Sequence, residues 1–178
     1  MTVERVAQDE RVRSDASIAA FVAEHYDRLL RLARLVCRDT GDAADAVQVG
    51  LEQAWRQRSS LRDDTRIRPW LDRIVMREAI RVSKSRQRWL SRLLTPSPEI
   101  KWLDPPDNKG SEPTTFVALR AAFAQLSPEQ RAVVAVHLHF GYTLAETAVI
   151  VGAPEETVRS RLRLARQRLR RELGEPGS

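Results

Sequence analysis

Cysteine is almost absent from the sequence, and its scarcity limits the chemistry that the chain can carry. Cys37 is the single cysteine among 178 residues, which excludes an internal disulfide and a zinc site built on several thiolates. It lies in the apolar stretch LLRLARLVCRD. We therefore expect Cys37 to be a small buried residue.

Long apolar runs are also missing. No stretch of about eighteen apolar residues occurs, so no membrane-spanning helix is expected. The first residues, MTVERVAQDERVR, lack the apolar core of a signal peptide. Both features predict a cytoplasmic protein that does not insert into a membrane.

Lysine is scarce, whereas arginine is abundant. Only three of the 30 basic residues are lysine, and the net charge of +6 with a pI near 10.3 favours a polyanionic partner, nucleic acid first. Arginine suits bidentate binding to phosphate and to guanine. A GC-rich genome would also raise the arginine content, but codon bias does not explain why the arginines cluster.

Strand-like alternation is absent, and the apolar residues recur at helical spacing. We predict helices over residues 16–36, over TGDAADAVQVGLEQAW and after the polar loop RSSLRDDTRIR. Gly41 is expected to break the chain before the second helix and Asp42 to cap it, while Pro69 suits the first position of the third. These helices form a first domain at residues 14–92 of an all-α protein.

Residues 93–113 differ in texture from their surroundings. Five prolines and one glycine argue against regular structure and predict a flexible linker, and residues 1–13 are expected to form a flexible extension. Fully extended, the linker could reach roughly 70 Å. Trp102 within it is expected either to clasp one domain or to have a role of its own.

Residues 114–175, the second predicted domain, carry well-marked helix boundaries. Two capping boxes and a turn glycine are predicted here: Ser127 with Gln130 around Pro128, Thr143 with Glu146, and Gly152. Each good cap stabilises a helix by about 1 kcal/mol, so these boundaries are strongly specified. A short helix, a glycine turn and a longer helix predict a helix-turn-helix.

The last predicted helix, EETVRSRLRLARQRLRREL, is the most basic part of the chain. Seven arginines and no acid occur between Thr157 and Arg171. One apolar stripe is expected to pack on the domain, formed by Val158, Leu162, Ala165, Leu169 and Leu173. Because the second helix of such a motif enters the major groove, Arg159, Ser160 and Arg163 are candidates for reading bases. A solvated basic helix without a ligand is the alternative.

Charge is divided unequally between two neighbouring helices of the first domain. Residues 39–52 contain four acids and no base, whereas residues 77–92 contain six bases and one acid. The basic stretch interleaves its cations with Trp89, a combination suited to DNA backbone and unstacked bases. Alternatively, it complements the acidic helix within the molecule. No histidine stands near the acids, so neither a metal nor a cofactor is expected.

Three motifs in this order, with the proline-rich gap before the last, resemble the bacterial sigma-70 family, specifically its small extracytoplasmic-function (ECF) group: DAADAVQVGLEQAW, LRDDTRIRPWLDRIV, and LSPEQRAVV followed by GYTLAETAVIVGAPEETVRSRLRLARQRLR. The resemblance covers residues 17–173 and implies sigma region 2 at 14–92 and a helix-turn-helix region 4 at 114–175. It implies promoter-specific transcription initiation with core RNA polymerase and promoter DNA as partners, no enzymatic activity, and control by an anti-sigma factor.

The resemblance also assigns roles to residues. Polymerase binding is implied for Asp45, Gln48 and Glu52, with Trp55 expected in the core. Recognition and melting of the minus-10 element, with one base flipped into a pocket, is implied for Arg62, Asp64, Thr65, Arg66, Arg68, Trp70, Arg73, Arg77, Arg81 and Lys84. Reading of the minus-35 element is implied for Thr157, Arg159, Ser160, Arg163 and Arg166.

The sequence departs from the family pattern at several of these places. Ala44 stands where glutamate is usual in the docking motif, and Arg77 occupies a position often held by asparagine at the base pocket. Leu164 stands where arginine is common, while Arg163 replaces a variable neighbour. The promoter preference should therefore not be copied from relatives.

Two other classes of protein compete with this interpretation. An autonomous helix-turn-helix regulator would explain the second domain, and it predicts tight promoter binding by the isolated protein. It leaves the acidic helix and the polar loop without a purpose. A metal-dependent nuclease would use Asp42, Asp45, Asp63 and Asp64, and it predicts cleavage on adding magnesium.

Overall fold

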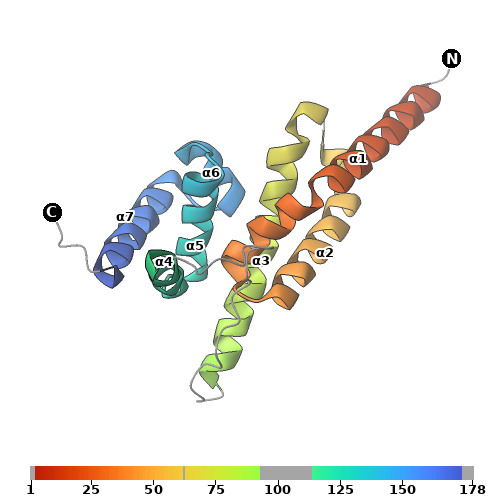
Figure 1. Ribbon diagram of the computed structural model, residues 1–178. Helices are drawn as coiled ribbons and strands as arrows, with labels where there is room; N and C mark the ends of the chain where they lie inside the picture. The colour runs from red at the N-terminus through yellow and green to blue at the C-terminus, as the bar shows by residue number, and fades with distance from the viewer. Residues whose placement is uncertain (1–2, 62, 93–113, 174–178) are drawn as a thin grey trace.

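The computed structural model describes residues 3–61, 63–92 and 114–173, and within these ranges it contains helices and no strand. Its helices, shown in Figure 1, are α1 (Val3–Cys37), α2 (Thr40–Arg56), α3 (Ile67–Arg92), α4 (Thr114–Ala124), α5 (Pro128–Val134), α6 (Leu144–Val151) and α7 (Glu155–Glu172). Shorter elements are the 3-10 turns η1 (Arg58–Ser60) and η2 (Asp64–Arg66) and the π-helical turn η3 (Ala135–His139). The predicted all-α fold class is confirmed. Among the described helices, none is both long and apolar enough to cross a bilayer.

The first helix is longer than the sequence analysis predicts. α1 begins at Val3, so residues 3–13, expected as a flexible extension, are helical. No glycine or proline occurs between Val3 and Cys37, and nothing in this stretch interrupts helix propagation. α1 ends before Arg38, whose φ of 66° is left-handed, a conformation common just past a helix C-terminus.

The N-cap of α2 is Asp39, so the expectation that Asp42 caps this helix was wrong. Asp39 has an extended backbone, and its carboxylate accepts a hydrogen bond from the Asp42 N–H at 3.0 Å. The left-handed exit at Arg38 completes the turn early, so Gly41 lies inside the first helical turn and does not break the chain. Asp42 still favours the helix, since its charge lies in the first turn.

α1, α2 and α3 pack against one another as the first half of the molecule (Figure 1). Their contacts are built from fully buried side chains: Leu29, Leu32, Val36, Val47, Leu71 and Val75. Gly50 allows a close approach of α2 to α3, because a Cβ at this position would lie 3.2 Å from the Cα of Val75. Cys37 is buried as predicted.

The helix boundaries of the second half follow the predicted signals. Both capping boxes form, Ser127 with Gln130 and Thr143 with Glu146. Gly152 adopts a left-handed φ of 70° between α6 and α7, which completes the predicted helix-turn-helix. The predicted linker at 93–113, including Trp102, lies outside the described residues.

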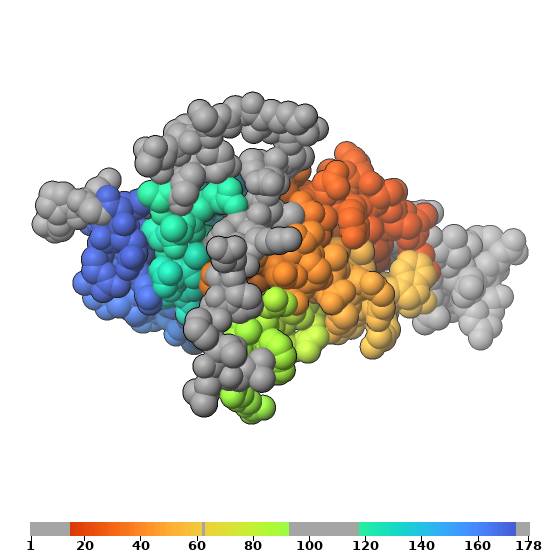
Figure 2. Space-filling view, turned by 60° about the horizontal axis from the view of Figure 1, so that its bottom comes forward, coloured from red at the N-terminus to blue at the C-terminus, as the bar shows by residue number. Residues whose placement is uncertain are grey.

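The two halves are in direct contact. Buried residues of α1, α2 and α3 form one apolar cluster with those of α5, α6 and α7, and α3 packs on both α5 and α6. In Figure 2 the second half, coloured teal to blue, lies beside the first half, coloured red to green. The shared core places the helix-turn-helix next to the basic helix α3.

Candidate nucleic-acid interface

α7 turns one face to the protein and the others to solvent. Val158, Leu162 and Ala165 of the predicted stripe are buried, whereas Leu169 and Leu173 are partly exposed. Arginines on the remaining surface are exposed: Arg159, Arg163, Arg166, Arg170 and Arg171. The helix therefore presents a cationic surface that begins within two turns of Gly152.

An open groove of about 1130 Å³ lies against this surface. Arg159, Arg163 and Arg166 line it together with side chains of α5, η3 and α6. Guanidinium groups around one hollow favour an anionic ligand, and arginine binds phosphate and guanine in a bidentate manner. Three of the predicted minus-35 residues thus share one surface, while Thr157 and Ser160 are partly buried.

The exposed arginines of this groove are not equivalent. Arg159 forms an ion pair one turn back with Glu155, and this hydrogen bond raises the pKa of the guanidinium. An exposed pair of this kind contributes little to stability, so DNA can displace it. Arg163 and Arg166 form no ion pair with another residue in the described ranges.

The polar loop before α3 is ordered by its own side chains. The Asp63 carboxylate accepts hydrogen bonds from the Thr65 hydroxyl at 2.6 Å and from the Thr65 N–H at 2.9 Å, which together lower the pKa of Asp63. Asp64 accepts a hydrogen bond from Ser17 of α1 at 2.9 Å. Asp64, Thr65 and Arg66 remain exposed, as does Arg68 in α3. Arg62 lies outside the described residues.

Trp70 differs from the other predicted minus-10 residues. It is only 7% exposed and belongs to the core, so its ring does not face a ligand in this structure. Its indole N–H donates to the Ser60 hydroxyl at 3.3 Å. Trp70 lies in the first turn of α3 and faces the core together with Leu71 and Ile74. Its hydrogen bond to Ser60 therefore anchors the polar loop to the core.

The remaining minus-10 candidates lie along α3, and three of them contact other side chains or backbone. Arg81 pairs with the nearly buried Glu78 at 2.7 Å. Arg77 donates to the backbone carbonyl of Val149 in α6 at 3.0 Å, and Lys84 pairs with Glu129 of α5 at 2.6 Å. Part of the predicted DNA face of α3 is thus bound to the second half of the protein.

The predicted polymerase-binding residues share one exposed face of α2. Asp45, Gln48 and Glu52 are all exposed. Trp55 was expected in the core but is 47% exposed, so that expectation was wrong. The spacing 45, 48, 52 and 55 places Trp55 on the same helical face as the acids, a signal that the sequence already carries. The guanidinium of Arg58 lies 4.9 Å from its ring centroid.

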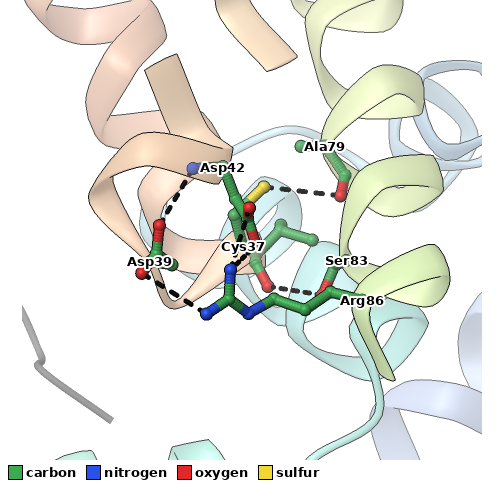
Figure 3. Close-up of polar contacts among 7 residues, drawn as sticks. Cys37, Asp39, Asp42, Ala79, Ser83 and Arg86 are labelled. Atoms are coloured by element: carbon green, nitrogen blue, oxygen red, sulfur yellow. Dashed lines mark hydrogen bonds and ion pairs between the residues drawn. The ribbon is translucent and has the colours of Figure 1, made fainter. Parts of the chain in front are cut away.

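The acidic start of α2 and the basic end of α3 meet through Arg86 (Figure 3). Its guanidinium lies 3.1 Å from Asp42 and 3.7 Å from Asp39. The alternative that the basic stretch complements the acidic helix is therefore correct for this residue. Trp89, at 58% exposed, is left on the surface of α3 near its end. Among the described residues, no cluster of three potential metal ligands occurs.

Cys37 is buried close to these ion pairs. Its thiol donates to the Ala79 carbonyl at 3.5 Å, and burial raises its pKa to about 12 (Figure 3). A thiol with such a pKa is almost fully protonated near neutral pH and is a poor nucleophile. Cys37 is therefore a packing residue.

A helix-turn-helix with an arginine-rich second helix, packed on a separate three-helix unit with its own exposed surfaces, defines a two-module DNA-binding protein. Models of known families match both modules: Sigma-70 region 2 matches residues 21–89, and Sigma-70 region 4 matches residues 116–169.

Named relatives agree with this assignment. The ECF RNA polymerase sigma factor SigM of Mycobacterium tuberculosis is 36% identical over 176 residues, covering 91% of this chain and 86% of the relative. SigL of the same species is 32% identical over 164 residues, covering 91% and 92%. The chain therefore belongs to the ECF group of the sigma-70 family.

Solved structures share the fold. The sigma factor RpoE from Bartonella quintana, in complex with the anti-sigma factor NepR, has a TM-score of 0.62 at 21% identity, covering 94% of this chain and 98% of that one. CnrH in complex with the cytosolic domain of CnrY has a TM-score of 0.58 at 20% identity, with the same coverage.

Proposed function

We propose that this sigma factor binds core RNA polymerase through α2, recognises the minus-10 element with the polar loop and α3, and reads the minus-35 element with α7. The observation that carries the proposal is the row of exposed arginines on α7 directly after the glycine turn. The domain limits that go with it are region 2 at residues 14–92, a linker at 93–113 and region 4 at 114–175.

At the minus-35 element, α7 would lie in the major groove. Arg163 and Arg166 are exposed and line the groove of the protein surface, so they can reach base edges and phosphates. Arg159 would join them after exchanging Glu155 for DNA. Thr157, partly buried at the start of the helix, suits contacts to the DNA backbone, and Ser160, also partly buried, is kept in the proposal as a base-reading candidate.

At the minus-10 element, the exposed loop would receive an unpaired base. Flipping a base costs a few kcal/mol, so a surface that is already ordered is an advantage. Asp63 and Trp70 provide that order, through the bonds to Thr65 and Ser60. Asp64, Thr65 and Arg66 are the side chains that face outward for the base.

Polymerase docking would use the exposed stripe of α2. Asp45 and Glu52 supply negative charge, Gln48 supplies an amide, and Trp55 adds an aromatic surface beside them. Tryptophan is enriched among residues that dominate protein interfaces. This stripe has no purpose in an autonomous helix-turn-helix regulator, and it favours a subunit of a larger assembly.

The remaining expectations complete the proposal. Relatives are sigma factors, and we propose that this chain likewise acts in the cytoplasm without catalysing a reaction of its own. RpoE and CnrH have been solved with NepR and with the CnrY cytosolic domain, and we propose that an anti-sigma factor restrains this chain too.

Transcription with purified core polymerase over a randomised promoter library tests the proposal. We expect transcripts from a small set of related promoters, and we expect the Arg163→Ala variant to change the selected minus-35 sequence. Arg171→Ala, which removes the same charge near the end of the same helix, is the matched control. Tight, specific promoter binding by the isolated chain, with no response to core enzyme, would favour the autonomous regulator.

A further inference from the structure

A nearly buried carboxylate joins two helices to which the proposed function gives different partners. Glu78 of α3 is 7% exposed. One of its carboxylate oxygens accepts a hydrogen bond from the side-chain amide of Gln53 in α2 at 2.8 Å. The other accepts one from the Nε–H of Arg81, one turn further along α3, at 2.7 Å. A carboxylate with so little access to water needs donors for its oxygens, and these two side chains supply them.

Arg81 is held at one edge of its guanidinium and is open at the others. Its side chain is 60% exposed, although its Nε–H is bound to Glu78. Within the described ranges, the two Nη groups of Arg81 form no hydrogen bond or ion pair. They carry four N–H donors between them, enough to bind a phosphate through two oxygens.

Arg81 differs from the two nearest predicted DNA-binding cations on α3. Arg77 donates to the Val149 carbonyl of α6, and Lys84 pairs with Glu129 of α5. Arg81 instead pairs within its own helix, with an acid that α2 holds in turn. Its orientation is therefore set inside the three-helix unit and leaves its charged end in solvent.

Two opposing effects of Glu78 on DNA binding follow from this geometry. A free arginine must be ordered when it binds, and immobilising such a side chain lowers affinity about two- to tenfold. Glu78 has already restricted Arg81, which favours binding, whereas its negative charge repels phosphate. Because the carboxylate is nearly buried and its charge is balanced by Arg81, we expect the ordering effect to be the larger one.

We propose that Glu78 is a positioning residue for promoter binding: it holds Arg81 toward a backbone phosphate of the minus-10 region, and Gln53 keeps Glu78 in place. Most hydrogen bonds between proteins and DNA go to the backbone, and an exposed guanidinium on the flank of a helix suits such a contact. Gln53 follows Glu52 of the predicted polymerase-binding residues, so the same contact links the docking helix to the DNA-binding helix. The inference rests on the proposed function, which makes α3 the helix that meets the minus-10 element.

A double-mutant cycle with Glu78→Gln and Arg81→Ala tests the proposal. Each variant is assembled with core polymerase, and fluorescence anisotropy measures binding to a promoter selected in the library at several salt concentrations. Arg81→Ala should bind about tenfold more weakly, and its log–log salt dependence should be shallower by about 0.7–0.9, because one phosphate contact is lost. Glu78→Gln keeps the shape of the side chain and should bind about threefold more weakly. In the Arg81→Ala background, Glu78→Gln should have no further effect.

Glu24→Gln is the matched control, since it makes the same chemical change on α1 at a side chain that is 76% exposed, and it should bind as the parent does. Gln53→Ala carries the test if circular dichroism shows that Glu78→Gln is unfolded. For Gln53→Ala we expect binding about twofold weaker, again only when Arg81 is present.

Three results would overturn the proposal. Glu78→Gln could bind as tightly as the parent or more tightly, as repulsion of phosphate by the carboxylate predicts. It could weaken binding equally with and without Arg81, as a purely structural role predicts. Arg81→Ala could bind as the parent does or change the selected minus-10 sequence, which a phosphate contact would not do. Failure of the proposed function would look different, namely no promoter-specific binding or transcripts from core enzyme with the parent chain.

Discussion

The two basic helices, α3 and α7, differ in what their cations contact. On α7 five arginines are exposed, and of these Arg159 pairs with Glu155 and Arg171 with Glu172, both acids of the same helix. On α3, Arg77, Lys84 and Arg86 are each bound to another element of the protein. Composition alone marks both helices as basic. The comparison teaches that tertiary contacts decide which basic helix is free to meet DNA.

The largest expected effect is on the stability of the fold, at the buried face of α3. Asp72→Ala leaves Arg28 buried without its carboxylate partner and removes the acceptor of Tyr142. We expect the free energy of unfolding to fall by about 3–5 kcal/mol in urea denaturation. Asp64→Ala, at an exposed acid of the polar loop, is the matched control and should cost below about 1 kcal/mol. Equal losses for the two variants would contradict the buried role of Asp72.

The next largest effect is expected on promoter discrimination by α7. Arg163→Ala should cost about 1–3 kcal/mol in discrimination at the minus-35 element, because a bidentate contact to guanine is worth this much. Transcription from matched and mismatched promoters with core enzyme measures it. Arg171→Ala should weaken all promoters alike. A base preference that is unchanged in Arg163→Ala would remove α7 from the reading of sequence.

A smaller effect, on affinity for core polymerase, is expected to distinguish the exposed Trp55 of α2 from the exposed Trp89 of α3. Trp55→Ala should weaken association with core polymerase by about 1–2 kcal/mol, since Trp55 extends the stripe of Asp45, Gln48 and Glu52. Trp89 is more exposed than Trp55 but lies on the basic helix α3, so Trp89→Ala should leave this affinity unchanged. Titration of labelled core enzyme measures both. The stripe is misassigned if the two variants behave alike.

The smallest effect on function is expected at Cys37. Cys37→Ala should leave transcription unchanged, because the thiol only packs and donates to Ala79. The native thiol should react slowly with iodoacetamide at pH 8. Since burial raises the pKa from 9.0 to about 12, the rate should keep rising with pH beyond 9, whereas in urea it should level off near 9. Rapid labelling of the folded protein at pH 8 would contradict the burial.

Local signals in the sequence were sufficient for much of the second half. The two capping boxes, Gly152 and the apolar stripe of α7 were predictable because each depends on residues within one or two turns. The spacing of Asp45, Glu52 and Trp55 would also have placed the tryptophan on the surface.

Contacts between distant segments were not predictable in this way. From the sequence alone, Arg131 looks like an ordinary surface arginine of α5. Its buried position depends on a hydrogen bond to the Val36 carbonyl at the end of α1, 95 residues away in sequence. The cap of α2 depended on the left-handed Arg38 just before it, which no residue type announces. The hydrogen bond between Tyr142 and Asp72 likewise depends on contact between the two halves of the chain.

The most direct test of the central claim is transcription by core polymerase with and without the chain, from a promoter selected in the library. We predict that transcripts depend on the chain and are lost when the α2 stripe carries Glu52→Lys, although that variant remains folded. Core enzyme that neither associates with the folded chain nor starts transcripts in its presence would contradict the assignment.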